Sequence, residues 1–369
     1  MKIVIACGGS GGHIFPAVAL AQGLKAKDAG CGIKFIGSNK SLDKRIFDKE
    51  KVNYSLLFAN KLPYKFSFGM LAFFVKFSFD IFKSLFILLK FRPDIVIGFG
   101  GYVSAPVIFA AYMLGIPRIV HEQNVIPGRA NARLFRLANR IAISFEETKA
   151  YLGPYAYKAV FTGNPIRISI LKGERGENIK KLGLDSNKFS ILIIGGSQGA
   201  HNLNKAFLQA LSQLGSVERA TLQVIHITGI MDYEWASEGY KELNIEHRIY
   251  SFIDRIEEVY SVADLVVTRS GASAIFEIAY FGKPMVLIPY PFAMSHQAEN
   301  AGIFSKKGAA IQIDEKELSA SLIKDRITDL LNDKKRLREM AESAKRLSMP
   351  DSSYVLAEQV LCLGKGWQE

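Results

Sequence analysis

The stretch that decides the fold is MKIVIACGGSGGHIFPAVALAQGL, residues 1–24. A short β-branched run is followed by four glycines around Ser10 and then by an apolar run with helical spacing. This order of strand, glycine loop and helix predicts a turn whose backbone N–H groups lie at a helix N-terminus, where anions and sugar hydroxyls bind. A tight turn with positive φ would explain one or two of the glycines without a ligand, but four glycines followed by His13 favour a binding loop.

Two familiar phosphate loops do not fit this spacing. The dinucleotide-binding fingerprint needs glycines at its first, third and sixth places, whereas Gly9 and Gly11 are followed by Ile14. The Walker loop needs Gly-Lys-Ser/Thr five places after its first glycine, and Gly8 is followed there by His13. A nicotinamide enzyme is therefore not expected, because it would need the missing fingerprint.

The composition limits the class of protein. A chain of 369 residues is long enough for two ordinary domains, each with its own core. Cys7, Cys31 and Cys362 are odd in number and widely separated, which predicts a reducing cytoplasm with neither a disulfide nor a zinc site. The apolar run at the N-terminus has only the length of a strand, so a secretory signal is not expected.

The charge of the chain points to an anionic partner. The net charge is +12 and the pI is about 9.4. A phosphorylated substrate, an anionic bilayer and nucleic acid would each suit this charge. Nucleic acid ranks last and is not expected as a partner, because no nucleic-acid-binding motif or arginine-rich tract occurs.

Strand patterns alternate with helical patterns along the chain. The runs with strand character are MKIVIA, IKFIG, PDIVIGF, PRIVHE, RIAIS, KAVFTG, FSILIIGG, LQVIHITG, HRIYSF, ADLVVTRS and PMVLIPY. Continuous β-branched runs between helix-length segments predict an α/β fold with parallel sheets covered on both faces. The polar stretch ILKGERGENIKKLGLDSNK interrupts the alternation, and FSILIIGGSQGAHNLNKAFLQAL then restarts the order of strand, glycine loop and helix.

The predicted architecture is two Rossmann-like parallel-sheet domains that face each other across a cleft. The N-terminal domain is expected at residues 1–165, the linker at 166–188 and the C-terminal domain at 189–349. A helix at about 350–369 is expected to pack back on the first domain. Ligands of such sheets bind at the carboxyl ends of the strands, where all the glycine loops of this chain fall.

The second half carries the more specific cluster. Ser197 and Gln198 of GGSQGA open a helix after a strand, so they and the N–H groups around them could bind phosphate oxygens. Arg167 of GNPIR could supply a guanidinium to the same phosphates. Glu277 lies about one turn into the next helix and could accept hydrogen bonds from a ribose diol, while Gln297, with Asn300, could bind sugar hydroxyls.

Each of these residues has an ordinary alternative. A lone Glu277 is more often a partner of the helix dipole, and a lone Arg167 is more often a surface charge. Together, however, the residues match the parts of a nucleotide sugar: a diphosphate, a ribose and a sugar.

Seven motifs of the chain also occur in this order and spacing in one known family. They are GGSGGHIFPA, GFGGYVSAP, HEQNVIPGRAN, FTGNPIR, GGSQGA, RSGASAIFE and HQAENA. From Met1 to about Ala301 the chain thus resembles the MurG family within glycosyltransferase family 28, the bacterial N-acetylglucosaminyltransferases that convert lipid I to lipid II in peptidoglycan synthesis. The resemblance implies a GT-B fold, UDP-N-acetylglucosamine as donor and undecaprenyl-pyrophosphoryl-N-acetylmuramoyl pentapeptide as acceptor. It further implies a peripheral position on the cytoplasmic face of the bacterial plasma membrane, with other cell-wall synthesis proteins as partners.

The resemblance implies donor-binding residues in both halves. Arg167, Ser197 and Gln198 are expected on the diphosphate, Glu277 on the ribose and Gln297 on the sugar. The further donor-binding residues that it implies are Ser10, Gly11, Gly12, Asn124, Ile253, Ala272, Ser273, Ala274, Ile275 and Phe276. The family pattern GASTIAE reads GASAIFE here, so the alanine at the threonine position leaves that contact to backbone N–H groups.

The substrates fix the chemistry that the resemblance implies. An α-linked donor and a β-1,4-linked product require inversion by in-line attack of the muramoyl 4-hydroxyl, which needs a general base and a stabilised leaving group. No Asp-x-Asp occurs, so a metal-independent reaction is expected, with helix N-termini and Arg167 bearing the leaving-group charge. His13 is the first candidate for the base and Glu122 the second. The alternative for His13 is a loop histidine that only orients a phosphate.

The stretch FGMLAFFVKFSFDIFKSLFILLKFRP, residues 68–93, is apolar almost all round when it is drawn as a helix. Its charges, Lys76, Asp80, Lys83 and Lys90, share one narrow stripe and recur too often for a membrane span. A helix buried between the domains is one alternative. An interfacial helix on an anionic membrane is expected instead, and its membrane-facing residues are predicted to be Phe73, Phe74, Phe77, Lys76, Lys83 and Lys90. The basic residues expected to flank it are Lys61, Lys65, Lys90 and Arg92.

Two further functions would fit part of this pattern. A UDP-N-acetylglucosamine epimerase would share the fold and the donor but would need no lipid-facing surface. A non-catalytic membrane subunit would keep the apolar helix but should lack a complete donor site. Transfer of sugar from labelled donor to a lipid-linked muramoyl acceptor would separate these possibilities.

Overall fold

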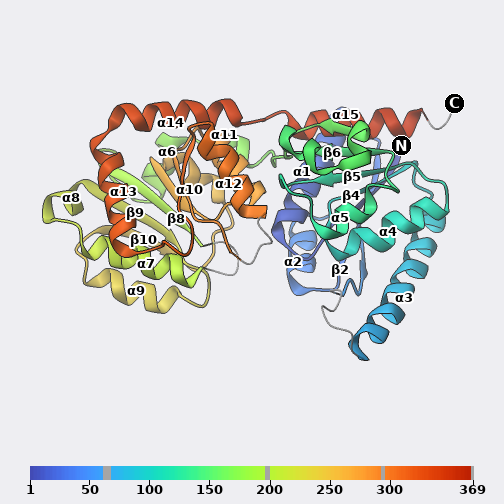
Figure 1. Ribbon diagram of the computed structural model, residues 1–369, viewed down its shortest axis with the longest axis horizontal. Helices are drawn as coiled ribbons and strands as arrows, with labels where there is room; N and C mark the ends of the chain where they lie inside the picture. Colours follow the sequence, from blue (N-terminus) through green and yellow to red (C-terminus); the bar gives the residue numbers. More distant parts are fainter. Residues whose placement is uncertain (61–67, 196–199, 292–295, 367–369) are drawn as a thin grey trace. The chain divides into compact units, whose positions relative to one another are not determined.

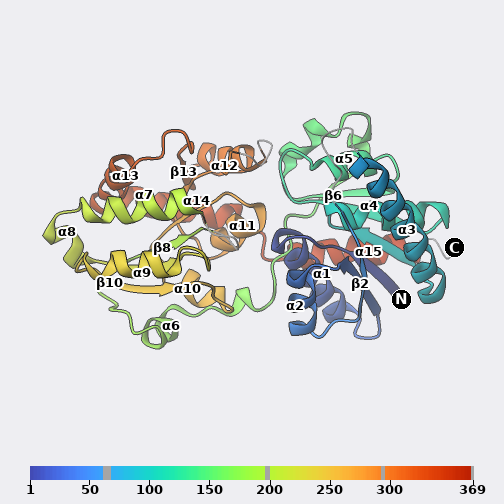
Figure 2. The ribbon, with the colours of Figure 1, turned by 90° about the horizontal axis from the view of Figure 1, so that it is seen from below.

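The computed structural model describes residues 1–60, 68–195, 200–291 and 296–366. The chain divides into two compact units, an N-terminal unit of residues 1–168 and 349–369 and a C-terminal unit of residues 169–348. Each unit is one parallel sheet with helices on its faces (Figures 1 and 2). The predicted α/β class with two parallel-sheet domains is therefore confirmed.

The N-terminal unit alternates strands and helices. Its elements are β1 (Lys2–Ala6), α1 (Gly11–Lys27), β2 (Gly32–Ser38), α2 (Ser41–Lys49), β3 (Tyr54–Leu57), α3 (Phe68–Phe91), β4 (Ile95–Gly98), α4 (Gly101–Met113), β5 (Arg118–Glu122), α5 (Arg129–Leu134), β6 (Arg140–Ile143), the 3₁₀ helices η1 (Glu146–Tyr151) and η2 (Gly153–Lys158), β7 (Ala159–Phe161) and α15 (Ser352–Lys365). The strand order is β3-β2-β1-β4-β5-β6-β7.

Both faces of this sheet are buried, which explains why its strands are continuously apolar. Along β1, Ile3 and Ile5 pack on the side of α1 and α15, whereas Val4 and Ala6 pack on the side of α3 and α4. α15 lies along α1 closely enough that a Cβ on Gly23 would come within 2.7 Å of the Ser353 carbonyl oxygen. The chain thus returns at its end to cover the first sheet.

The C-terminal unit repeats the plan. Its elements are η3 (Ile170–Lys172), α6 (Arg175–Lys181), β8 (Phe189–Ile194), α7 (His201–Ser212), α8 (Ser216–Thr221), β9 (Leu222–Ile227), α9 (Tyr233–Lys241), β10 (Glu246–Tyr250), α10 (Ile256–Val262), β11 (Leu265–Thr268), α11 (Ala272–Tyr280), β12 (Met285–Leu287), α12 (His296–Lys306), β13 (Ala310–Gln312), α13 (Ala320–Asn332) and α14 (Lys334–Leu347). The strand order is β10-β9-β8-β11-β12-β13.

The structure adds detail at three places. β3 and β13 were not predicted as strands, and each is a short strand at the edge of its sheet. Residues 169–188, expected within the linker, belong to the C-terminal unit, where Asn178 of α6 donates a hydrogen bond to the Ser261 hydroxyl of α10.

The sheet topology creates one switch point in each unit. In the N-terminal unit the chain leaves β1 toward β2 and returns to β4 on the other side of β1. In the C-terminal unit β8 and β11 have the same relation. Ligands of open α/β sheets bind outside the carboxyl ends of the strands at such a point, so the loops after β1, β4, β8 and β11 are the ones to inspect.

Candidate active site

The first glycine loop follows β1 and is held by a buried carboxylate. Gly9 has a φ of 85°, and its N–H donates to both carboxylate oxygens of Asp43 at 3.0 and 3.1 Å. Asp43 also accepts the N–H and the hydroxyl of Ser38 at 2.9 and 2.7 Å. A Cβ on Gly8 would lie 2.3 Å from Asp43 Oδ2, so this glycine is required by close approach. The loop ends at Ser10, the N-cap of α1, and Gly11 and Gly12 form the first turn.

The second glycine loop follows β4 and covers the His13 imidazole. Gly100 and Gly101 have φ values of 86° and 72°, which L side chains rarely adopt. A Cβ on Gly100 would lie 3.3 Å from His13 Cε1, and one on Gly101 would lie 3.8 Å from His13 Nε2. His13 is thus brought from α1 to the start of α4, at the switch point of the N-terminal unit.

Glu122, at the end of β5, accepts hydrogen bonds on both carboxylate oxygens. Oε1 accepts the backbone N–H and the side-chain amide of Asn124 at 2.9 and 3.1 Å. Oε2 accepts the Gly128 N–H at 3.0 Å and the Asn131 amide at 2.8 Å. The side chain is buried with 1% exposure, so this carboxylate organises the loop from Asn124 to Asn131.

A second buried histidine lies beside this carboxylate. His121 Nε2 faces the Gly163 carbonyl oxygen at 3.2 Å, and its Nδ1 faces the Gln123 amide nitrogen at 3.1 Å. The same Gln123 nitrogen donates to the Phe99 carbonyl at 2.9 Å. Burial lowers the pKa of His121 to about 4, so this imidazole is neutral at physiological pH.

Burial also lowers the pKa of His13 below its ordinary value. The opposing influences are the Glu122 charge, the nearby Gln123 side chain and Phe99 carbonyl as acceptors, and the Asp43 charge. A lowered pKa favours the neutral imidazole, which can accept a proton, so this environment suits a general base, and that role of His13 stays a prediction.

Arg167 lies beside the first glycine loop. Its guanidinium carbon lies over the Phe15 ring, 4.1 Å from the ring centre, which is within cation–π range. The next residue, Ile168, donates its N–H to the Gln22 side chain at 2.9 Å, so two residues of α1 hold this segment. Arg167, the residue predicted to bind phosphate, is therefore fixed to α1, the helix that begins at the glycine loop.

In the C-terminal unit, the loop after β11 leads into α11. Gly271 is the N-cap, and Ala272, Ser273 and Ala274 form the first turn, whose N–H groups point toward the N-terminal end of the helix. Glu277 follows in the second turn and is buried with 8% exposure. Glu277, which is predicted to bind the ribose, and the predicted backbone N–H donors therefore lie near the same end of α11.

Two of the residues predicted to bind the donor pack into the core of the C-terminal unit. Ile275 is fully buried, and its N–H donates to the Gly271 carbonyl at 3.2 Å. The Phe276 side chain is buried against Phe304, with ring centres 5.7 Å apart. Their side chains thus have a role in the core, and their contacts with the donor stay predictions.

Gln297 and Asn300 of α12 are tied to the loop after β11. The Ser270 hydroxyl donates to the Gln297 carbonyl at 2.7 Å, and the Asn300 amide donates to the Ser270 carbonyl at 3.2 Å. Gln297 Oε1 accepts the Tyr290 N–H at 2.9 Å. These contacts bring the predicted sugar-binding helix to the predicted nucleotide-binding loop within one unit.

Of the remaining residues predicted to bind the nucleotide sugar, some lie within the described part of the chain and some do not. Ser197 and Gln198 lie outside the described residues, as do Lys61 and Lys65 near the apolar helix. Ile253 is half-buried in the loop after β10, at the same edge of the sheet as the loop after β11. Asn124 is half-buried and engages Glu122.

Several organising residues were missed by sequence reasoning. Asp43 gave no signal, because a single aspartate in the first turn of α2 resembles an ordinary dipole partner. His121, Gln123 and Asn131 lie within the quoted motif HEQNVIPGRAN, so that motif was the available signal. Among the described residues, no group of three or more His, Cys, Asp or Glu side chains could hold a metal ion.

The outer face of α3 is apolar and exposed. Exposed fractions are 54% for Phe74, 64% for Val75, 53% for Phe79, 71% for Phe82, 66% for Phe86 and 60% for Leu89. Lys76, Lys83 and Lys90 are also exposed, whereas Phe73 and Phe77 are half-buried and stack on each other. Across the parts of the chain with described coordinates, no helix is long and apolar enough to cross a membrane.

The predicted polar stripe of α3 needs one correction. Asp80 is buried with 2% exposure, and its carboxylate accepts the N–H groups of Phe58 and Ala59 at 2.9 Å each. It therefore fastens the start of the loop after β3 to α3 and is not part of a solvent-facing stripe. The lysines line one border of the apolar face instead.

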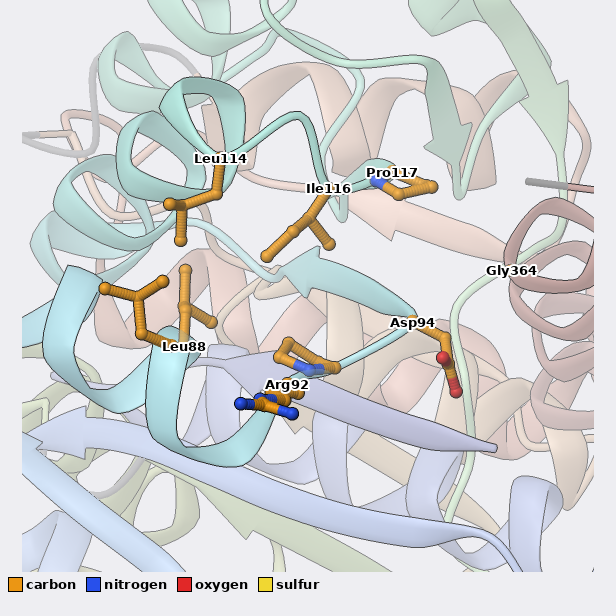
Figure 3. A pocket seen from close by; sticks show the side chains of 9 residues that line it. Leu88, Arg92, Asp94, Leu114, Ile116, Pro117 and Gly364 are labelled. Atoms are coloured by element: carbon orange, nitrogen blue, oxygen red, sulfur yellow. The ribbon is translucent and has the colours of Figure 1, made fainter. Parts of the chain in front are cut away.

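A cavity of about 580 Å³ lies at the end of the N-terminal sheet opposite the glycine loops (Figure 3). Leu88, Arg92 and Asp94 at the end of α3 and Ile116 and Pro117 before β5 line it. These residues precede β4 and β5, whereas the glycine loops follow the strands. The cavity is thus separate from the candidate active site.

Residues 3–143 match the glycosyltransferase family 28 N-terminal domain, and residues 190–356 match the glycosyltransferase family 28 C-terminal domain. A relative from Halothermothrix orenii is 39% identical over 374 residues, which cover 99% of this chain and 100% of the relative. That relative is named "UDP-N-acetylglucosamine--N-acetylmuramyl-(pentapeptide) pyrophosphoryl-undecaprenol N-acetylglucosamine transferase".

Solved structures with the same fold include two instructive ones. Acinetobacter baumannii MurG matches with a TM-score of 0.76 at 26% identity, covering 98% of this chain and 99% of that chain. A UDP-GlcNAc 2-epimerase from Neisseria meningitidis bound to UDP-GlcNAc matches with a TM-score of 0.72 at 16% identity, covering 98% of this chain and 100% of that chain. At that identity the second likeness shows the fold alone.

Proposed function

The chain belongs to glycosyltransferase family 28, and from this premise we propose how its residues make lipid II by moving N-acetylglucosamine from UDP-N-acetylglucosamine to lipid-linked N-acetylmuramoyl pentapeptide. It is a hexosyltransferase that depends on this nucleotide sugar. The observation that carries the conclusion is that both family domains occur in order, one on each structural unit, in a chain that matches a named transferase along its length.

The C-terminal unit is the donor-binding unit in this proposal. The first turn of α11 offers N–H groups to the anionic part of the nucleotide, and Glu277 accepts hydrogen bonds from the ribose hydroxyls. Gln297 binds the sugar from α12, and Ile253 holds the uracil through its backbone. The hydrogen bonds of Ser270 with α12 support this assignment, because they hold the helix that binds sugar against the loop that binds nucleotide.

The N-terminal unit activates the acceptor, and His13 is the general base. The muramoyl 4-hydroxyl oxygen attacks the anomeric carbon, its proton passes to the imidazole, and UDP leaves with the electron pair of the broken C–O bond. Glu122 is less suited to this task, because both of its oxygens accept hydrogen bonds from Asn124, Gly128 and Asn131. Arg167 and the helix N-termini balance the charge of the departing diphosphate.

An anionic membrane surface is the proposed site of action. The exposed phenylalanines of α3 would enter the region of the headgroups, and Lys76, Lys83 and Lys90 along their border would contact anionic lipids. The net charge of +12 supports such a surface. A lipid-linked acceptor lies in that surface, so docking would bring the enzyme to its substrate at the cytoplasmic face of the membrane.

The deciding experiment mixes the purified protein with labelled UDP-N-acetylglucosamine, with and without a lipid-linked muramoyl pentapeptide. The expected result is acceptor-dependent transfer of the label to the lipid and release of UDP. Conversion of the nucleotide sugar to its 2-epimer without acceptor would instead identify an epimerase. Membrane binding without either reaction would identify a non-catalytic subunit.

A further inference from the structure

Three buried polar atoms around the proposed base have no hydrogen-bond partner among the described residues, and one of them, Asn131 Oδ1, belongs to the amide that donates to Glu122. The other two are His13 Nδ1 and Gln123 Oε1. A buried polar atom that stays unsatisfied costs about 1–3 kcal/mol, so a partner is expected for each. One atom can be a donor and the other can only accept, which makes the two complementary.

The orientation of the Gln123 amide is fixed by its other end. Its nitrogen lies 2.9 Å from the Phe99 carbonyl oxygen and 3.1 Å from His121 Nδ1. A carbonyl oxygen can only accept, so the amide nitrogen must be on this side and Oε1 must be on the other. The second amide proton then requires His121 Nδ1 to accept, which places the proton of His121 on Nε2, where it donates to the Gly163 carbonyl at 3.2 Å.

We propose that Gln123 is a positioning residue that fixes the tautomer of His13: Oε1 accepts the proton of His13 Nδ1, which leaves the lone pair of Nε2 to take the acceptor's proton. The chain of hydrogen bonds runs from the Gly163 carbonyl through His121 and Gln123 to His13. Each side chain in the chain has one orientation, because the backbone carbonyls of Gly163 and Phe99 can only accept hydrogen bonds. Nε2 lies on the side of the Gly101 turn, at the start of α4.

This inference rests on the proposed role of His13 as the base. The charged and titratable groups that act on His13 are Glu122 and Asp43, whose charges favour the protonated imidazole, and the neutral His121 behind Gln123. The Phe99 carbonyl also faces His13 and already accepts one hydrogen bond, from the Gln123 amide. Gln123 Oε1 accepts none from the described residues, so it is the acceptor that gains most from the Nδ1 proton.

The direct test is the tautomer of His13 in the full-length protein labelled with ¹⁵N-histidine. Long-range ¹H–¹⁵N spectra at pH 7.5 distinguish the two neutral tautomers, and a His13→Asn variant identifies the signals among the six histidines. The expected result is a proton on His13 Nδ1 and a proton on His121 Nε2. A proton on His13 Nε2 in the wild-type protein would overturn the proposal without any variant having to fold.

The kinetic test uses Gln123→Met, which keeps the length of the side chain but removes the acceptor. We expect kcat to fall about 10- to 100-fold, with the KM for UDP-N-acetylglucosamine unchanged. Because the hydrogen bond favours protonated His13, its loss lowers the pKa of His13, and the acidic limb of the profile of kcat/KM against pH moves to lower pH. A purely structural loss would lower activity without moving that limb.

Gln223→Met is the matched control. Gln223 is fully buried in β9 of the C-terminal unit, and its amide donates to the Asp185 carbonyl and the Ser190 hydroxyl. This variant also removes a buried amide, but it should leave the acidic limb and the His13 tautomer unchanged. If Gln123→Met leaves kcat and the acidic limb where they are in the wild type, the positioning role is wrong. If the tautomers are as expected but His13→Ala retains turnover, the hydrogen-bond chain stands and the role of His13 as base fails.

Discussion

In the N-terminal unit the switch point lies between β1 and β4, and in the C-terminal unit it lies between β8 and β11. The first is surrounded by titratable and amide side chains: His13, Glu122 and their buried partners. The described part of the second presents a helix N-terminus with small residues, and Glu277 is the carboxylate of that helix. The same topology therefore serves different chemistry in the two units.

Under the proposed function, this difference divides one fold between two substrates. A network that fixes protons suits the activation of a hydroxyl, and a helix N-terminus suits the binding of a diphosphate. Changes in the N-terminal unit should then act mainly on turnover, and changes in the C-terminal unit should act mainly on donor affinity. The predictions below test this division.

The largest effect is expected for His13→Ala. Loss of a general base lowers turnover by about 10²- to 10⁴-fold, while the KM for UDP-N-acetylglucosamine stays close to that of the wild type. Steady-state kinetics from pH 5 to pH 9 with both substrates varied separately would measure this. Near-normal turnover at every pH would move the base elsewhere, with Glu122 next to be tested as Glu122→Gln.

Membrane binding is the next property in which the two units should differ. Changing Phe82 and Phe86 together to Ser should weaken binding to anionic vesicles by about 2–4 kcal/mol, because each ring loses burial in the bilayer. Co-sedimentation at low and high salt measures it. The control changes Ile230 and Met231 of the C-terminal unit, which are 77% and 88% exposed, to Ser. Equal loss in both double variants would contradict a docking surface on α3.

Most of this arrangement could be predicted from the sequence. The glycine loops, the central strands and the site motifs have strong local signals, because buried parallel strands are continuously apolar and the loops need glycine. The helix with the exposed phenylalanines was also visible, because its apolar residues exceed what one buried stripe can use. Two of the residues predicted to face the membrane, Phe73 and Phe77, are half-buried, which the pattern did not indicate.

The parts that were not predicted depend on contacts between distant residues. β3 and β13 are short edge strands whose pairing with β2 and β12 supplies what their own sequences do not signal. Asp80 belongs to a polar pattern on α3, but the N–H groups of the preceding loop turn it inward. The packing of Ile275 and Phe276 likewise follows from the tertiary core and not from their motif.

Acid should destabilise both units to a similar extent. Burial lowers the pKa of His121 to about 4 and that of His226, which contacts Asn204 and Tyr240, to about 3. Between pH 6.5 and these values only the unfolded chain takes up the proton, so stability is present above pH 6.5 and is lost as the pH falls. At pH 5 each histidine should cost about 2 kcal/mol of unfolding free energy relative to pH 7.

Denaturant unfolding at pH 7, 6 and 5 would measure this loss. His121→Gln should reduce the pH dependence of the N-terminal unit alone, and His226→Gln that of the C-terminal unit alone. A variant whose stability keeps the full pH dependence would show that another group is responsible.

Donor affinity should depend on the C-terminal carboxylate. Glu277→Ala removes the proposed acceptor of the ribose hydroxyls, so UDP-N-acetylglucosamine binding should weaken by about 1–3 kcal/mol while acceptor KM stays constant. Calorimetric titration with UDP measures the donor effect directly. Unchanged donor affinity in a folded variant would leave Glu277 with only its role toward the helix dipole.

The smallest effect is expected where the division between the units is least sharp, at Arg167. This residue belongs to the N-terminal unit and its guanidinium lies over the Phe15 ring, yet it is expected on the diphosphate of the donor. Phe15→Leu should weaken donor binding by about 0.5–2 kcal/mol, because the guanidinium loses its aromatic support. In a double-mutant cycle the same change should cost nothing once Arg167 is Met, since the ring acts through the guanidinium. If the pair instead changes the acceptor KM and leaves the donor KM alone, Arg167 serves the pyrophosphate of the lipid, and the N-terminal unit binds the whole acceptor without a share in the donor.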